Sequence, residues 1–308
     1  MDLFKINAHK LQPLKRTAFK LEREIQRLLE ANLDEVYGIR FLASEFSTGD
    51  KHPGRIDSLG LDENGTPVII EYKLSGNQAV INQALYYLDW LVDHRGDFEL
   101  LVQRTFGSDV TIDWAAPRVL CVAEDFSHYD TYAVKTIGAN IELWKYRVFA
   151  GEYLAIELVG GGSTVGVGKG GGKKVAGGAK GGGKGKGLGA AVYTLEDHLA
   201  KAKGELRVVA DELYEYVSGL GDDVVASPVK LYVPFRTTRN FCCLEVHAKH
   251  VFLYLALDAA AGDDCDFCRD VRHIGHFGTG DLEVRVERAD QVAKAKELAK
   301  RAYEKAGK

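Results

Sequence analysis

Apolar residues recur every three or four positions in several stretches of the chain, which is the spacing of amphipathic helices. The long stretches are residues 17–36, 77–94, 195–220 and 289–307, and a shorter one lies near 128–137. Each stretch can turn an apolar stripe toward a core. We therefore expect a helix at each of these places.

Other stretches alternate apolar and polar residues or form short apolar runs, which are the two patterns of β-strands. The predicted strands are residues 38–46, 54–61, 67–73, 98–103, 118–124, 142–149 and 152–159, followed by 230–236, 241–249, 250–257 and 282–288. Helices and strands interleave in the first half, which predicts an α/β domain with a mixed sheet and helices on both faces. The second half predicts a smaller α+β domain.

A segment of glycine and lysine at residues 160–191 separates the two halves: GGGSTVGVGKGGGKKVAGGAKGGGKGKGLGAA. It has too little apolar surface to offset the entropy lost on folding. We therefore predict a flexible linker between a domain at 1–159 and a domain at 192–308. Its lysines either keep the segment soluble or add a weak, salt-sensitive affinity for a polyanion.

Charge changes this picture because it is spread unevenly over a chain of 308 residues with a net charge of −4. Residues 1–159 hold 17 Lys and Arg against 24 Asp and Glu, whereas the linker holds six Lys and no acid. Residues 192–308 hold 17 basic and 20 acidic residues. The sequence does not indicate a globally basic nucleic-acid binder, so any phosphate affinity must come from local patches, a metal or the linker.

The apolar runs are too short to indicate a membrane protein. No run of about 18 apolar residues is present, and the N-terminal MDLFKINAHKLQPLKR lacks the apolar core of a secretion signal. We expect a cytoplasmic protein with no membrane partner, in which the five cysteines are reduced thiols. The sequence leaves the oligomeric state open, with a homodimer as one alternative.

Three charged residues interrupt the otherwise apolar hairpin GRIDSLGLDENGTPVIIEYK at residues 54–73. Asp57 lies in the first strand, and Glu71 and Lys73 end the second. Because side chains alternate between faces, Asp57 shares a face with Glu71 only if a loop of odd length joins the strands. A two-residue turn would instead place Asp57 opposite Tyr72. We predict the odd-length loop, which would bring the carboxylates within about 5 Å of each other.

Two carboxylates this close repel each other unless a cation lies between them. Carboxylate oxygens suit Mg²⁺ or Mn²⁺, so Asp57 and Glu71 are candidate metal ligands, with the Tyr72 carbonyl as a further ligand. Lys73 could orient a metal-bound water, help to deprotonate it, or neutralise charge on a phosphate. These are the components of metal-assisted phosphodiester hydrolysis.

The spacing from Asp57 through Glu71 to Lys73, Asp-x13-Glu-x-Lys, resembles the signature of the PD-(D/E)XK nuclease superfamily. Over about residues 15–160 the chain is similar to the NucS-like endonuclease domain, through LEREIQ, GIRFLASEF, GRIDSLG, VIIEYK and INQALYYLDWL. The resemblance implies a restriction-endonuclease-like fold and a Mg²⁺- or Mn²⁺-dependent DNA endonuclease. It also implies a role in DNA repair or defence.

The resemblance implies further site residues outside the hairpin. A helix before the sheet often supplies a third acidic residue in this superfamily, which here would be Glu22, with Glu24 as the neighbouring candidate. Gln83 and Tyr87 look like the Gln-x-x-x-Tyr element of RecB-like members. The alternative is that these residues are solvated helix charges and packing groups.

The C-terminal half contains a cluster of soft metal ligands: Cys265, Cys268, His273 and His276. This composition suggests zinc, but the gap between the Cys pair and the His pair is too short for a zinc finger. Cys242 and Cys243 are not included, because they fall in a strand pattern and we expect them to pack in a core.

Basic and aromatic residues interleave in KLYVPFRTTRNF, where Lys230, Tyr232, Phe235, Arg236 and Arg239 lie close together. Such a pattern can bind nucleic acid, or it can be a core face backed by a solvated face. DVRHIGHFGTGDLEVRV and the closing helix resemble a small domain of unknown function that often follows NucS-like nuclease domains.

Two functions of different classes follow. The first is a metal-dependent nuclease, in which Arg55 and His52 beside the hairpin contact the nucleic acid or are only surface loop residues. The second is a nucleic-acid or protein interaction module whose nuclease-like fold does not cut. The retained Asp57, Glu71 and Lys73 favour the nuclease, since buried unpaired charges are costly.

Overall fold

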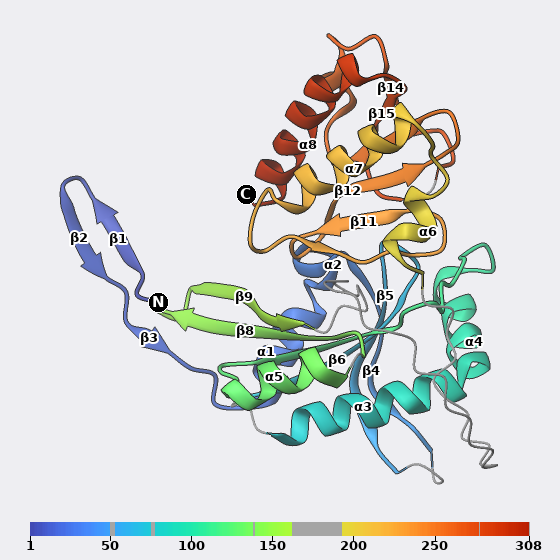
Figure 1. Cartoon of the computed structure of the whole chain (residues 1–308). Coiled ribbons are helices and arrows are strands. Elements are labelled where there is room, and N and C mark those ends of the chain that lie inside the picture. Colours follow the sequence, from blue (N-terminus) through green and yellow to red (C-terminus); the bar gives the residue numbers. More distant parts are fainter. Residues whose placement is uncertain (50–52, 75–77, 138, 162–192, 277, 308) are drawn as a thin grey trace, which may run out of the picture.

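The computed structural model describes residues 1–49, 53–74, 78–137, 139–161, 193–276 and 278–307. These residues form a seven-stranded sheet, a six-stranded sheet, and a two-stranded hairpin that projects away from both (Figure 1). Within these residues, no helix is long and apolar enough to cross a membrane.

The seven-stranded sheet has the order β3-β8-β7-β6-β5-β4, with β9 also paired to β8. Its strands are β3 (Arg16–Thr17), β4 (Ile39–Ser47), β5 (Arg55–Asp62), β6 (Pro67–Lys73), β7 (Arg118–Ala123), β8 (Ile141–Phe149) and β9 (Tyr153–Gly161). β6, β7 and β8 run parallel, whereas the other pairs are antiparallel. The prediction of a mixed sheet is therefore confirmed.

Helices cover both faces of this sheet, as the sequence predicts. One face is covered by α1 (Glu22–Glu30) and α2 (Leu33–Tyr37), whose apolar residues pack on Val68, Ile70 and Tyr72. The other face is covered by α3 (Gln78–Asp93), α4 (Arg95–Phe106) and α5 (His128–Ile137). The fold of this part is an α/β domain with a buried core on each side of one mixed sheet.

The C-terminal part is a smaller α+β domain around an antiparallel sheet of order β10-β11-β12-β13-β15-β14. The strands are β10 (Val225–Ala226), β11 (Val233–Arg236), β12 (Asn240–Val246), β13 (Val251–Leu255), β14 (Cys268–Asp270) and β15 (Leu282–Val286). The helices are α6 (Leu195–Leu199), α7 (Glu205–Ser218) and α8 (Val292–Ala306), with short 3₁₀ turns η1 (Ala259–Gly262) and η2 (Ala289–Gln291). α7 and α8 pack on the sheet through a single apolar core.

One predicted strand is wrong. Residues 98–103 lie within helix α4, which buries Phe98 and Val102. These side chains are four positions apart and share one helical face. A six-residue apolar run fits a buried strand or one side of a helix equally well, and tertiary packing decides between them.

Other boundaries also differ from the prediction. The helix expected over 17–36 is two helices, α1 and α2, and the helix expected over 195–220 is α6 and α7. The projecting hairpin of β1 (Phe4–Asn7) and β2 (Lys10–Pro13) was not predicted. The linker prediction for 160–191 lies outside the described residues, except that Gly160 and Gly161 end strand β9.

Candidate active site

The loop between β5 and β6 has the odd length that the sequence analysis requires. Five residues separate the last paired residues, Leu61 and Pro67. Gly65 adopts a φ of +74°, and its N–H donates to the Asp62 carbonyl (3.0 Å). The Asp62 carboxylate accepts from the N–H groups of Asn64 and Thr66, both at 2.9 Å. Glycine accepts this left-handed conformation without steric cost, so the local sequence sets the loop length.

The strand register places Asp57 opposite Glu71. Ser58 pairs with Ile70 and Leu59 pairs with Ile69, and extending this register by one residue brings 57 to 71. Ile69 packs on the α3 side of the sheet. By alternation, Glu71 and Lys73 leave the sheet on that same side.

The two carboxylates are held by backbone groups of the opposite strand. The Asp57 N–H donates to Glu71 Oε1 (3.2 Å), and the Tyr72 N–H donates to Asp57 Oδ2 (3.0 Å). These reciprocal bonds occur beyond Ser58 and Ile70, the last paired residues at this end of the hairpin. Glu71 is 1% exposed and Asp57 is half-buried. The hairpin thus holds both carboxylates at the end of its ladder.

Burial disfavours the charged forms of both acids, and the Asp57 charge adds to this effect at Glu71. Burial, together with the nearby Asp57 charge, raises the pKa of Glu71 to about 9. Burial also raises the pKa of Asp57, where the Tyr72 N–H and Lys73 act in the opposite direction. A metal-free Glu71 therefore holds a proton at neutral pH.

Lys73 joins this pair to helix α1. Its Nζ lies 3.2 Å from Glu22 Oε2. Burial lowers the pKa of Lys73, but Asp57 and Glu22 outweigh burial and leave that pKa raised. Glu24 instead binds the backbone at the helix start: its Oε2 accepts from the N–H groups of Lys20 (2.7 Å) and Leu21 (3.1 Å). The structure therefore brings Glu22, rather than Glu24, to the hairpin.

Helix α3 brings Tyr87 to the same end of the sheet. The Tyr87 hydroxyl accepts from the Arg55 N–H (3.2 Å). Burial is the largest cause of the raised pKa of Tyr87, and the Glu71 and Asp57 charges raise it further. Within the described residues, Oε1 of Gln83 is buried without a hydrogen-bond partner. His52, the other predicted contact for nucleic acid, lies outside the described residues.

Glu45 in β4 is a further acidic residue at this site that was not predicted from the sequence. Ser44 pairs with Ser58 and Phe46 pairs with Ile56, so Glu45 lies opposite Asp57 on the neighbouring strand. Glu45 has a φ of +52°, which a non-glycine residue rarely adopts, and it forms an ion pair with Arg55. Burial is the main cause of the raised pKa of Asp57, and the Glu45 charge raises that pKa further. Predicting from sequence that Glu45 lies opposite Asp57 would have required knowledge of the register shift between Phe41 and Ala43.

The donor set suits a hard divalent cation that keeps several waters. Asp57 and Glu71 each use one carboxylate oxygen on a backbone N–H, which leaves one oxygen of each free to face a cation. Within the described part of the chain, no group of three or more His, Cys, Asp or Glu is arranged to hold a metal. Mg²⁺ commonly binds through only one or two carboxylates plus water, so two carboxylates fit Mg²⁺ or Mn²⁺ better than a closed zinc site.

The C-terminal domain holds the turn of this same hairpin. The Tyr232 hydroxyl and Asn240 Nδ2 both donate to Asn64 Oδ1, at 3.1 and 2.8 Å. The Asn240 N–H donates to Glu63 Oε2 (2.8 Å). One end of the hairpin therefore carries the acidic pair, and the other end is bound by the second domain.

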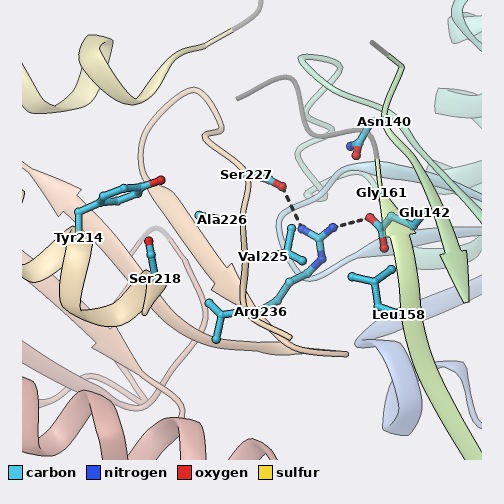
Figure 2. A pocket seen from close by; sticks show the side chains of 11 residues that line it. Asn140, Glu142, Leu158, Gly161, Tyr214, Ser218, Val225, Ala226, Ser227 and Arg236 are labelled. Carbon is cyan, nitrogen blue, oxygen red and sulfur yellow. Dashed lines mark hydrogen bonds and ion pairs between the residues drawn. The ribbon is translucent and has the colours of Figure 1, made fainter. Parts of the chain in front are cut away.

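A buried charge network lies beside this contact. Arg118 binds Asp62 at 2.8 Å and Glu142 at 2.9 Å, and Arg236 of the C-terminal domain also binds Glu142. Figure 2 shows Arg236 between Ser227 and Glu142 at the edge of an interdomain cavity of about 300 Å³. In the stretch KLYVPFRTTRNF, Tyr232, Phe235 and Arg236 are buried, whereas Lys230 is exposed and Arg239 is partly exposed. This favours the alternative of a core face backed by a solvated face over a nucleic-acid surface.

The cysteine prediction is also corrected. Cys265 and Cys268 form a disulfide with a Cα–Cα distance of 5.3 Å, within the range that a disulfide needs. They are neither reduced nor positioned as zinc ligands. His276 stacks on Tyr254 instead, with ring centroids 4.7 Å apart. Cys121, Cys242 and Cys243 are buried thiols.

We expect Gly65→Ala to disturb the hairpin. The positive φ is strained for alanine, and the new Cβ would lie 2.5 Å from the Thr111 carbonyl oxygen. Gly151→Ala is a matched control, with a φ of +73° and no heavy atom within 4 Å of its Cβ. The control should cost about 1 kcal/mol of unfolding free energy, and Gly65→Ala roughly 3 kcal/mol or more. Denaturant unfolding of both variants measures the difference, and equal costs would contradict the close approach.

Two solved structures are similar to part of this chain. One is described as "Structure of EndoMS-dsDNA2 complex", with 18% identity over 44% of this chain and 50% of that chain, at a TM-score of 0.25. The other is a crystal structure of a repair endonuclease from Pyrococcus abyssi, with 17% identity over 47% of this chain and 64% of that chain, at a TM-score of 0.29. The match thus spans half to two thirds of the length of these solved chains.

Residues 195–306 match the family described as "Domain of unknown function (DUF5655)", which confirms the predicted resemblance of the C-terminal part to such a domain. An uncharacterized protein of Haemophilus influenzae is 28% identical over 309 aligned positions, covering 98% of this chain and 99% of its relative. The similarity to that relative extends over both domains.

Proposed function

We propose that this protein is a Mg²⁺- or Mn²⁺-dependent nuclease that hydrolyses phosphodiester bonds, with DNA as the favoured substrate and endonucleolytic cleavage as the favoured mode. The observation that carries the proposal is the convergence of Asp57, Glu71, Lys73 and Glu22 at one end of a sheet. This arrangement places the buried Glu71 carboxyl group opposite the half-buried Asp57 carboxylate. Such a pair is costly for a fold and useful for binding a cation.

Asp57 and Glu71 would hold the metal through their remaining carboxylate oxygens, with the Tyr72 carbonyl as a further ligand. When bound, the metal would lower the pKa of a coordinated water and polarise the scissile phosphate. The protein fixes both carboxylates through the Asp57 and Tyr72 N–H groups, so the ligands need no rearrangement.

Lys73 would orient the attacking water or stabilise charge on the phosphate. Its ion pair with Glu22 keeps the ammonium at the hairpin end, and Asp57 helps keep it protonated. Lys73 therefore serves as a positioned cation rather than a base. Glu22 would complete the acidic cluster around the water.

Tyr87, Gln83 and Arg55 would position the substrate. Tyr87 holds the backbone at Arg55, and the buried amide oxygen of Gln83 is available to accept from a bound water. The Arg55 side chain, paired with Glu45 at the surface, would contact a phosphate.

The rival function is an interaction module that does not cut. A cleavage screen with single-stranded, duplex, flapped and mismatched DNA, each with Mg²⁺ and Mn²⁺, tests the nuclease proposal. Calorimetric titration of Mn²⁺ into wild type and Asp57→Ala accompanies it. Cleavage by the wild type and metal binding lost in Asp57→Ala would support the nuclease. A wild type that binds no metal and cuts none of the substrates would leave the interaction module.

Metal binding should release a proton at neutral pH. The pKa of Glu71 is raised to about 9, so metal must displace its proton, and affinity should rise with pH up to that value. The unfolding free energy of the metal-free protein should fall as pH rises from about 4 toward 9. The reason is that the Glu71 carboxyl group loses its proton at a lower pH in the unfolded chain than in the folded one. Calorimetry in two buffers of different ionisation enthalpy counts the proton. Glu71→Gln should flatten the stability profile, and a pH-independent affinity in the wild type would refute the expectation.

A further inference from the structure

The N-terminal hairpin of residues 4–13, here called the arm, has no described partner in the fold. Its strands β1 and β2 pair only with each other among the described residues, and the Leu14 N–H closes its base on the Leu3 carbonyl (2.8 Å). Every residue of both strands is exposed. Figure 1 shows the arm extending away from both sheets. An isolated two-stranded hairpin is marginally stable in water, so a partner bound along the arm would stabilise it.

The arm has two faces of different chemistry. Its register pairs Lys5 with Gln12 and Asn7 with Lys10, so these four residues share one face. Asn7 Nδ2 donates to Gln12 Oε1 (3.0 Å), which aligns the two amides along the ribbon. The opposite face is apolar and consists of Phe4, Ile6, Leu11 and Pro13. The polar face therefore contains two cations and two amides, and no carboxylate.

The charge of the arm is opposite to that of the domain that carries it. Residues 1–20 hold five Lys and Arg against a single acid, Asp2. Residues 21–159 hold 12 basic and 23 acidic residues. The arm region is therefore the cationic end of an acidic domain, and it is complementary to a polyanion.

A short segment also joins the arm to the helix that carries Glu22, one of the acidic residues at the candidate active site. β3, at residues Arg16–Thr17, joins the chain to the edge of the large sheet by pairing with β8. Leu14, at the base of the arm, precedes Glu22 by eight residues, so the base of the arm lies within about 29 Å of the helix start that carries Glu22. A ligand several nucleotides long can reach both places.

We propose that the polar face of the arm binds duplex DNA in the major groove, beside the phosphodiester presented to the Glu22–Lys73 pair. The placement at the active site rests on the proposed function. The major groove is about 12 Å wide and admits a two-stranded ribbon. Lys5 and Lys10 contact phosphates or guanine, and Asn7 and Gln12 offer the amide pairs that read adenine. The arm thereby supplies the phosphate attraction that the acidic domain lacks.

Fluorescence anisotropy with a labelled, mixed-sequence duplex of about 20 base pairs, roughly two helical turns, tests this contact in full-length, metal-free protein. Substituting both Lys5→Gln and Lys10→Gln should weaken binding roughly tenfold per lysine at about 0.1 M salt. It should also reduce the slope of log affinity against log salt by about 2. The matched control, Lys300→Gln with Lys305→Gln, removes the same charge from exposed positions on α8. An equal loss in the control, or no loss in the arm variant, overturns the proposal.

The apolar face provides the competing outcome, a contact with a second copy of the chain. Substituting Ile6→Thr and Leu11→Thr with sedimentation analysis tests it. A shift from dimer to monomer, while the lysine variant binds DNA normally, assigns the arm to dimerisation and overturns the DNA contact. Cleavage is measured separately. A wild type that binds DNA through the arm lysines but cuts none of the substrates refutes the proposed nuclease and supports the arm contact.

Discussion

Glu71→Gln and Asp57→Asn should each reduce metal-dependent cleavage by more than about 10³-fold, since a bound metal supplies several kcal/mol of transition-state stabilisation. Both substitutions keep an oxygen that can accept from the same backbone N–H, so the hairpin ladder should survive. Each also removes a carboxyl group whose ionisation is disfavoured by burial. The metal-free variants should therefore melt at the wild-type temperature or above it, while Mn²⁺ binding by calorimetry is weakened or lost.

Lys73→Ala separates catalysis from metal binding within the same prediction. Metal affinity should be unchanged or tighter, because a neighbouring cation is gone, whereas cleavage should fall by about 10²–10⁴-fold. Lys296→Ala is the matched control, since Lys296 pairs with Glu212, whose exposure of 48% resembles the 47% of Glu22. Cleavage by the control should be unchanged. If all the hairpin variants unfold readily and the wild type binds no metal, the charges are structural and the nuclease proposal is wrong.

The hairpin was predictable because local rules determine it. The Gly65 turn and the two-residue alternation of side chains fix which residues face each other, and both are visible in a short sequence. Residues 98–103 show the limit of the same reasoning. Their apolar run fits a strand or a helix, and the contacts of Phe98 and Val102 with distant parts of the core select the helix.

The candidate site was predictable in its hairpin residues and less so elsewhere. Asp57, Glu71 and Lys73 are positioned by one register, whereas Glu45 depends on an irregularity in β4 that no sequence period reveals. The partners of Asn64 and Glu63 lie more than 160 residues away in the C-terminal domain. Such long-range polar contacts leave no local pattern, so they require the structure.

Through its contacts with the β5–β6 turn, the C-terminal domain is connected to the hairpin that carries Asp57 and Glu71. Asp62 caps the turn through its own carboxylate and also accepts from Arg118, while Arg118 shares Glu142 with Arg236 of the other domain. The turn that joins the strands of Asp57 and Glu71 is therefore held by charged residues at the domain boundary.

Arg118→Ala should be the most destabilising single substitution considered, costing roughly 3–5 kcal/mol of unfolding free energy, because it leaves Asp62 without its cation and Glu142 with Arg236 alone. The control is Arg288→Ala, which breaks an exposed pair with Asp290 and should cost less than about 1 kcal/mol. Burial raises the pKa of Glu142, but Arg118 and Arg236 lower it to about 2. Its stabilising contribution is therefore complete above pH 4 or so and is lost as pH falls toward 2. Arg118→Ala should weaken this acid dependence in urea unfolding curves recorded from neutral to acidic pH. A cost equal to that of Arg288→Ala would mean that the network contributes little to the fold and does not hold the hairpin turn.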